Sequence, residues 1–263
     1  MKKIFLLTIL LSCLFLSCTT RPEPPNTQDH LIMSVLWYQK SAEMKALYHQ
    51  SFNWAKYRIE QEINNQKKEK KSAVIVDIDE TMLDNSPFEA NCVKTGKGYT
   101  KERWTEWTAK TMAEALPGAV EFTCFAKSKG VEVFYISNRS VDEFDVTLKN
   151  LQQANFAFAD SAHLFLKSTT SSKKLRREVV AQNYEIILLL GDNLGDFSDI
   201  FEDRTDNYGF GTVEEQQDLF GKKFIILPNP MYGAWEESVF PSGQELSGKE
   251  KYTLRKKALQ GYK

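Results

Sequence analysis

Four short runs of apolar, often β-branched residues recur along the chain after position 70, at 73–78, 131–136, 186–190 and 224–227. They lack the polar alternation of strands with one wet face, and are typical of parallel strands buried on both faces. Helix-like segments at 117–129, 141–154 and 171–183 separate them. This alternation predicts an α/β domain with a doubly wound, mainly parallel sheet.

Two further segments complete the predicted domain, which we place at residues 31–263. Residues 31–66 carry apolar side chains at helical spacing and contain no glycine or proline, which predicts one long helix or two. Residues 84–116 are rich in Trp, Tyr and Lys and are too long for an ordinary strand-to-helix turn. We expect this second segment to form a small helical cap.

The N-terminus has the pattern of a secretory signal at residues 1–17, with a basic pair, an apolar run at 4–16 and prolines soon after it. The apolar run is shorter than the roughly 20 residues that a membrane span needs. Cys18, which follows the small residue Ser17, is typical of bacterial lipoprotein processing and lipidation. Cys13 as the anchor, or an ordinary signal with an incidental cysteine, are the alternatives. Residues 18–30 then form a lipidated tether.

Charge and cysteine content exclude some classes of function. The 34 basic and 35 acidic side chains give a net charge of -1, so the sequence shows no bias toward nucleic acid or an anionic membrane surface. Three scattered histidines have no metal-ligand spacing, so zinc is not expected. Cys92 and Cys124 could pair in an oxidising periplasm or remain thiols.

Polar residues follow three of the four predicted strands, at 77–81, 137–139 and 191–196. In doubly wound sheets, ligands bind at the carboxyl ends of the strands. These residue types suit phosphoryl chemistry, so we expect the active site there.

Asp77 and Asp79 lie two positions apart where the first strand gives way to a loop. An ionised carboxylate can attack phosphorus, and a second, proton-bearing carboxyl can protonate the leaving alkoxide. Adjacent carboxyls push their proton affinities apart, which favours an acidic working range. A calcium loop starting at Asp77 is excluded, because Met82 and Phe88 replace the required glycine and glutamate.

A carboxylate that attacks a phosphate dianion needs positive charge between the two, which Mg²⁺ supplies through hard oxygen ligands. Asp192 and Asp196, four positions apart after the third strand, can provide those ligands. Gly191 and Gly195 allow that loop to turn tightly.

Phosphate oxygens also need donors from the protein. Ser137 and the backbone amide of Asn138 can hydrogen-bond the phosphoryl group, and a lysine at the start of a helix can balance its charge. Lys173, which follows Ser171 and Ser172, is favoured for that role over Lys167.

Two motifs, IVDIDETMLDN at 75–85 and LGDNLGDF at 190–197, resemble the signatures of the bacterial class C acid phosphatases. These are lipoprotein members of the haloacid dehalogenase superfamily with four motif aspartates, and the similarity runs from about residue 31 to 252. The resemblance implies a Rossmannoid fold with a helical cap, Mg²⁺ as cofactor, and a homodimer. Phe88 departs from the family's tyrosine, and Gly195 replaces an aspartate of some members.

The resemblance also assigns roles by position. It makes Asp77 the nucleophile and a metal ligand, and Asp79 the acid/base whose main-chain oxygen also binds the metal. Asp192 becomes a side-chain ligand, and Asp196 supports the metal site. The phosphate is held by Ser137, Asn138 and Lys173, and the substrate is flanked by Trp104 and Tyr232.

The sequence therefore predicts a Mg²⁺-dependent acid phosphatase or 5′-nucleotidase that acts through a phospho-aspartate. Its expected substrates are nucleoside monophosphates, nicotinamide mononucleotide and other small phosphomonoesters, and no nucleic acid polymer is expected as a partner. The expected location is the bacterial cell envelope, with a lipid anchor in the outer membrane on its periplasmic side. A dehalogenase is disfavoured because it has no use for an acid at Asp79. A non-catalytic nucleotide-capture lipoprotein remains the alternative.

Overall fold

The computed structural model describes residues 28–64 and 69–262. The predicted signal at 1–17 and the tether up to residue 27, including Cys13 and Cys18, lie outside the described residues. The described chain enters secondary structure at Asp29, where a short 3₁₀ helix, η2 (Asp29–Leu31), begins.

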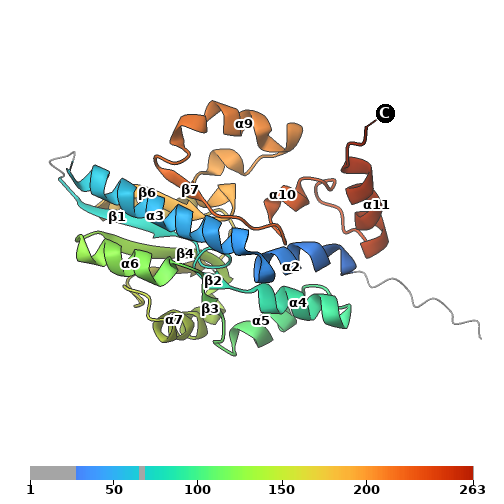
Figure 1. The fold of residues 1–263 in the computed structure, drawn as a ribbon, viewed down its shortest axis with the longest axis horizontal. Coiled ribbons are helices and arrows are strands. Elements are labelled where there is room, and N and C mark those ends of the chain that lie inside the picture. Colours follow the sequence, from blue (N-terminus) through green and yellow to red (C-terminus); the bar gives the residue numbers. More distant parts are fainter. Residues whose placement is uncertain (1–27, 65–68, 263) are drawn as a thin grey trace, which may run out of the picture.

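Within the described residues, five strands form one parallel sheet in the order β5-β4-β1-β6-β7 (Figure 1). The strands are β1 (Lys71–Val76), β4 (Glu132–Ser140), β5 (Leu164–Lys167), β6 (Tyr184–Gly191) and β7 (Phe224–Ile226). The chain runs outward from β1 through β4 to β5 and then returns to the other side of β1 as β6. The predicted doubly wound α/β fold is confirmed, and its winding direction reverses between β1 and β6.

The sequence pattern does not predict β5. This edge strand has only four residues, its side chains alternate between buried and half-buried, and it contains no β-branched residue. Its pairing with β4 makes it a strand, and that pairing is a tertiary contact. A second, two-stranded antiparallel sheet of β2 (Leu83–Asp84) and β3 (Glu114–Ala115) is likewise too short to leave a pattern.

Successive residues of β1 point to opposite faces of the sheet and enter two separate cores. Val74 and Val76 pack into the larger core, and Ala73 and Ile75 into the smaller one. The larger core is covered by α3 (Ala42–Asn64), α6 (Ala119–Ser128) and α7 (Phe144–Gln153). The smaller core is covered by α8 (Lys174–Asn183) and α9 (Phe210–Glu215). Because both faces of the sheet are buried, successive residues along the central part of each strand are apolar.

The N-terminal helical segment is two helices, α2 (Ile32–Lys40) and α3, separated at Ser41. Ser41 has an extended backbone, and its hydroxyl accepts a hydrogen bond from the N–H of Met44 at 3.0 Å. This hydrogen bond caps the N-terminus of α3, because the serine hydroxyl accepts from a first-turn N–H that has no carbonyl partner within the helix. A new helix therefore begins after Ser41. None of the helices in the described ranges combines the length and the apolar character that a membrane crossing requires.

The segment expected to form a cap folds into α4 (Ser86–Thr95) and α5 (Lys101–Thr108), and β2 and β3 close its base. Gly96, at φ +68°, ends α4 in the left-handed conformation that glycine adopts readily. Figure 1 shows α2, α4, α5 and α10 (Ala234–Glu237) gathered at one end of the molecule, with α11 (Gly248–Ala258) beside them. The remaining short 3₁₀ helices are η3 (Val141–Glu143), η4 (Leu194–Asp196), η5 (Asp199–Phe201), η6 (Asn207–Gly209) and η7 (Gln217–Leu219).

Both cysteines of the described chain are free thiols. Cys92 is buried in α4, and Cys124 is exposed on α6. Of the two alternatives left by the sequence, the structure therefore has thiols and no disulfide between these positions.

Candidate active site

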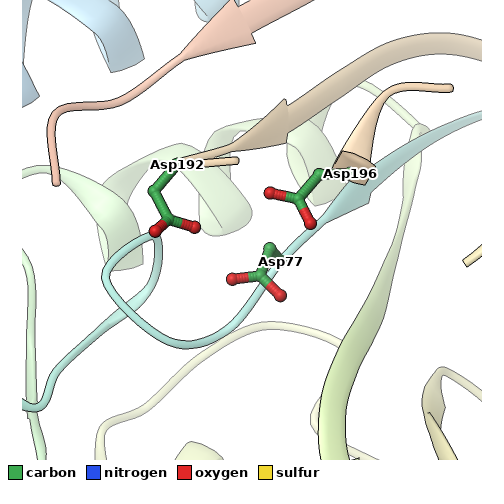
Figure 2. Close-up of side chains that lie close together, drawn as sticks. All are labelled: Asp77, Asp192 and Asp196. Carbon is green, nitrogen blue, oxygen red and sulfur yellow. The ribbon is translucent and has the colours of Figure 1, made fainter. Parts of the chain in front are cut away.

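Three aspartates meet where two neighbouring strands end. Asp77 directly follows β1, and its N–H donates to the carbonyl of Leu190 in β6 at 2.9 Å. Asp192 directly follows β6, and Asp196 ends η4 a few residues later. Figure 2 shows the three carboxylates turned toward one another, and one oxygen of each lies within 4.8 Å of the others. The site occupies the point where the winding of the sheet reverses, which is where such folds bind ligands.

The backbone after β6 is shaped to bring Asp196 inward. One Asp196 carboxylate oxygen, Oδ2, accepts from the N–H of Asn193 at 2.9 Å, and the Asn193 side chain accepts from Gly195. A Cβ placed on Gly191 would lie 2.2 Å from Asp196 Oδ2. Gly191 is therefore required, because any side chain there would displace this carboxylate.

Lys173 lies among these carboxylates. It immediately precedes α8, is buried, and its ammonium contacts Asp77 Oδ1 and lies 2.7 Å from Asp196 Oδ1. Burial acts to lower the pKa of Lys173, but Asp196 and Asp77 outweigh it and raise that pKa above its usual value. Lys173 is thus a charged lysine beside Asp77, whereas Lys167 lies at the end of β5 and does not line the cavity around these aspartates.

Three carboxylates around a single lysine leave excess negative charge. Burial raises the pKa of Asp77 to about 7; Lys173 opposes this, and Asp196 and Asp79 add to it. Burial also raises the pKa of Asp192 well above its usual range, with Asp196 and Asp77 acting in the same direction. A cation among them would relieve this cost. Clustered carboxylate oxygens without sulfur or nitrogen ligands suit a hard cation such as Mg²⁺.

Asp79 borders the same cavity as these three aspartates, and it forms an ion pair that the sequence did not reveal. Arg139 holds it with two nitrogens, Nη2 at 2.7 Å and Nε at 3.0 Å from Asp79 Oδ1. The Arg139 side chain is almost fully buried. It directly follows Ser137 and Asn138 in β4, so its position at a polar strand end was the available signal. The paired guanidinium balances the charge of this carboxylate and fixes its orientation at the cavity.

The two predicted phosphate-binding residues of β4 lie differently. Asn138 is exposed and lines the cavity, and Arg176 holds its side-chain oxygen at 2.7 Å. Ser137 is fully buried; its hydroxyl donates to Asp79 Oδ2 at 3.3 Å and accepts from the N–H of Arg139 at 3.1 Å. In this structure Ser137 therefore supports Asp79, and its contact with phosphate stays a prediction.

Asn85 joins Asp79 to the cap helix α5. It is fully buried, its amide nitrogen donates to Asp79 Oδ1 at 2.8 Å, and its side-chain oxygen accepts from the indole of Trp107 at 2.8 Å. Its backbone N–H donates to Glu80 at 2.8 Å. Asn85 and Glu80 both stand in the first motif, but motif spacing alone does not indicate these partners.

A cavity of about 1110 Å³ contains most of the predicted residues. Its walls include Asp77, Asp79, Asn138, Lys173, Asp192 and Asp196, together with Trp104 and Tyr232. Trp104 is half-buried on α5, with the ring of Phe88 packed edge-on at 5.2 Å and the Arg139 guanidinium 5.7 Å from its centroid. Tyr232 lies in the loop after β7, and its hydroxyl bonds to Glu80. The structure thus brings both predicted substrate-flanking rings to the cavity that holds the aspartates.

Comparison with known proteins identifies similar chains. The family described as HAD superfamily, subfamily IIIB (Acid phosphatase), matches residues 19–235. The structure of the class C acid phosphatase from Bacillus anthracis is 40% identical and covers 90% of this chain and 100% of that chain, with a TM-score of 0.86. A second structure of that enzyme, with tungstate bound, matches to the same extent.

Two curated plant proteins are more distant relatives. The stem 31 kDa glycoprotein of Glycine max is 27% identical over 164 residues, which is 60% of this chain and 58% of the relative. Acid phosphatase 1 of Solanum lycopersicum is 25% identical over 170 residues, which is 60% of this chain and 57% of that protein. The chain thus spans less than two thirds of the length of these relatives.

Proposed function

Because the chain belongs to the acid phosphatase family of the HAD superfamily, subfamily IIIB, we propose that it is a Mg²⁺-dependent phosphomonoesterase that works through a phospho-aspartate on Asp77. The main support for this proposal is that Asp77, Asp192 and Asp196 converge with the buried ammonium of Lys173 at the ends of β1 and β6. Tungstate, the oxyanion in the second Bacillus anthracis structure, has the tetrahedral shape of phosphate, which supports a phosphate ligand.

The proposed reaction has two steps. In the first, an Asp77 carboxylate oxygen attacks phosphorus, the bond to the leaving oxygen breaks, and Asp79 gives that oxygen a proton. In the second, water attacks the same phosphorus, Asp79 takes the proton, and the acyl phosphate bond breaks to release phosphate. Each residue then returns to its starting state.

The charges around Asp77 make attack on an anion feasible. Asp192 and Asp196, with Asp77, would hold the cation; when bound, Mg²⁺ supplies positive charge between the nucleophile and the phosphate dianion. Lys173 contacts Asp77 Oδ1 and Asp196 from within the protein and orients the nucleophile. Asn138, fixed by Arg176, offers donors at the cavity wall for the phosphoryl oxygens.

A direct test is the hydrolysis of p-nitrophenyl phosphate and of adenosine 5′-monophosphate, each with and without EDTA. We expect turnover of both substrates and its loss on chelation. A protein that binds the nucleotide tightly and releases no phosphate would contradict the proposal and favour the nucleotide-capture alternative.

For the substrate, we propose nucleoside monophosphates or nicotinamide mononucleotide, with other small phosphomonoesters also accepted. Trp104 and Tyr232 line the cavity that contains Asp77, and stacking on a base tolerates different bases because every base has a π-face. The enzyme should therefore discriminate weakly among bases, but it should prefer phosphomonoesters that carry a base over acyclic ones.

The Trp104→Ala/Tyr232→Ala double variant tests this assignment. Stacking is worth roughly 1–3 kcal/mol per base, so the KM for 5′-mononucleotides should rise about ten-fold or more. Turnover of glycerol phosphate, which has no ring, should be largely kept. Trp54→Ala, which removes a half-exposed tryptophan of α3 that does not line this cavity, is the matched control. Equal losses on both substrates would mean that the rings hold the cap helices and do not bind the base.

We further propose that Cys18 is lipidated and anchors the enzyme to the bacterial outer membrane. In this proposal the catalytic domain begins near residue 31, and its cap comprises residues 84–116. Cys18→Ser should block acylation and move phosphatase activity from the membrane fraction to the soluble fraction. Fractionation and incorporation of labelled palmitate measure this. Continued labelling of the variant would place the anchor at Cys13 or another site.

A further inference from the structure

Glu80 is fully buried directly beside Asp79, and every polar group of this residue has a partner within the protein. Its N–H donates to the carbonyl of Leu83 at 2.9 Å, and Oε1 accepts from the N–H of Asn85 at 2.8 Å. Its φ of +56° lies in the left-handed region, which residues with side chains rarely adopt. Such a conformation persists only where the surroundings impose it, so Glu80 is held in a defined position.

The second carboxylate oxygen of Glu80 accepts a hydrogen bond from the hydroxyl of Tyr232. The two residues are 152 positions apart and come from the loops after β1 and β7. Tyr232 is half-buried and lines the cavity, whereas Glu80 has no exposed surface and does not line it. The hydroxyl end of Tyr232 thus points into the protein, and its ring borders the substrate space.

Two further residues, Tyr48 and Asn229, fix both loops. The hydroxyl of Tyr48 in α3 contacts the Glu80 carbonyl and lies 3.4 Å from the carbonyl of Pro228, near the start of the Tyr232 loop. Asn229 accepts from the N–H of Met231 at 3.0 Å and donates to Asp192 Oδ2 at 2.8 Å. The Tyr232 loop is therefore attached to the metal-site loop at Asn229 and to the Asp77–Asp79 loop through Glu80.

We propose that Glu80 is a positioning residue that sets the enzyme's affinity for the ring-bearing part of its substrate, because its carboxyl group fixes the Tyr232 ring through the phenol hydroxyl. This rests on the proposed function, in which Tyr232 stacks on the substrate. A phenylalanine in place of Tyr232 would keep the stacking surface but would lose its orientation. Glutamine in place of Glu80 would keep both contacts, since its oxygen can accept from Asn85 and its amide can donate to the Tyr232 hydroxyl.

The test compares Tyr232→Phe, Glu80→Gln and Glu80→Ala with adenosine 5′-monophosphate and glycerol phosphate as substrates. We expect Tyr232→Phe and Glu80→Ala to raise the KM for the nucleotide about 3–10-fold with kcat nearly unchanged, which corresponds to roughly 0.7–1.4 kcal/mol of lost binding. Glu80→Gln should stay within about two-fold of the wild type. The double variant Tyr232→Phe/Glu80→Ala should be no worse than Glu80→Ala alone, because Glu80→Ala already removes the contact that Tyr232→Phe removes.

Two controls separate this inference from the proposed function. Tyr135→Phe deletes another buried tyrosine hydroxyl, one that lies outside the site and donates to the carbonyl of Ala157 at a distance of 2.6 Å. This variant should leave both KM values unchanged. The same substitutions in an Asp77→Asn background allow the dissociation constant of the nucleotide to be measured by calorimetry without turnover. Absence of catalysis in the wild type would contradict the proposed function while this binding measurement still decides the role of Glu80. An unchanged nucleotide affinity in Tyr232→Phe, or additive losses in the double variant, would overturn the inference.

Discussion

Asp77→Asn should reduce the turnover of every phosphomonoester by at least roughly 10⁴-fold, because a neutral amide cannot form the acyl phosphate and loss of a nucleophile has effects of that size. The fold should be kept, since the asparagine oxygen can still accept from Lys173 and one of several mutually repelling carboxylates is removed. Steady-state kinetics and the melting temperature measure the two effects. Asp199→Asn, a substitution at a half-exposed surface ion pair with Lys174, is the matched control and should leave activity unchanged.

Asp79→Asn should give a loss that depends on the leaving group. p-Nitrophenolate is stable without a proton and an alkoxide is not, so the loss should be smaller for p-nitrophenyl phosphate than for an alkyl phosphate such as glycerol phosphate. The amide keeps one acceptor for Arg139, which preserves the geometry of the pair. Equal losses on the two substrates would show that Asp79 does not act as the acid.

Removal of Mg²⁺ should have the second large effect. Dialysis against EDTA should abolish turnover, and added Mg²⁺ should restore it, because Asp77, Asp192 and Asp196 otherwise repel a phosphate dianion. Asp192→Asn should require at least about ten-fold more Mg²⁺ for half-maximal activity, since even outer partners of metal ligands contribute 10–100-fold. Activity that survives exhaustive chelation would contradict the assignment of the metal site.

The same cation should stabilise the fold. At a Mg²⁺ concentration of about 100 times the dissociation constant, the gain is about 2.7 kcal/mol. For a domain of this size it corresponds to a rise in melting temperature of roughly 5–10 °C. Differential scanning fluorimetry measures this shift, which should be smaller in Asp192→Asn.

The Mg²⁺-induced shift should also depend on pH. In the metal-free protein, burial raises the pKa of Asp77 to about 7, above the value near 3.9 of an unfolded chain. The folded state therefore binds more protons, and the stability that this contributes is present below about pH 4 and is lost as the pH rises through about 7. Mg²⁺ needs the ionised carboxylates, so its stabilisation should be larger at pH 7.5 than at pH 5.5. A larger shift at the lower pH would contradict this sign.

Much of the fold could be predicted from the sequence, because each strand of the buried parallel sheet except β5 contains a short continuous apolar run. β5 escaped detection because an edge strand of four alternating residues depends on its partner, β4. The break at Ser41 was similarly undecided, since a serine inside an apolar helical pattern is compatible with either one helix or two. The hydrogen bond from Met44 settles it.

The candidate site was likewise predictable only in part. The sequence by itself determined the aspartates, their order and their place at strand ends, because a parallel sheet brings the carboxyl ends of β1 and β6 to one edge wherever the chain folds this way. Only the tertiary structure decided the partners of those groups. Arg139 reaches Asp79 across 60 positions, and Glu80 reaches Tyr232 across 152. Motif spacing describes neighbours along one strand or loop, whereas these contacts depend on how separate loops pack at the end of the sheet.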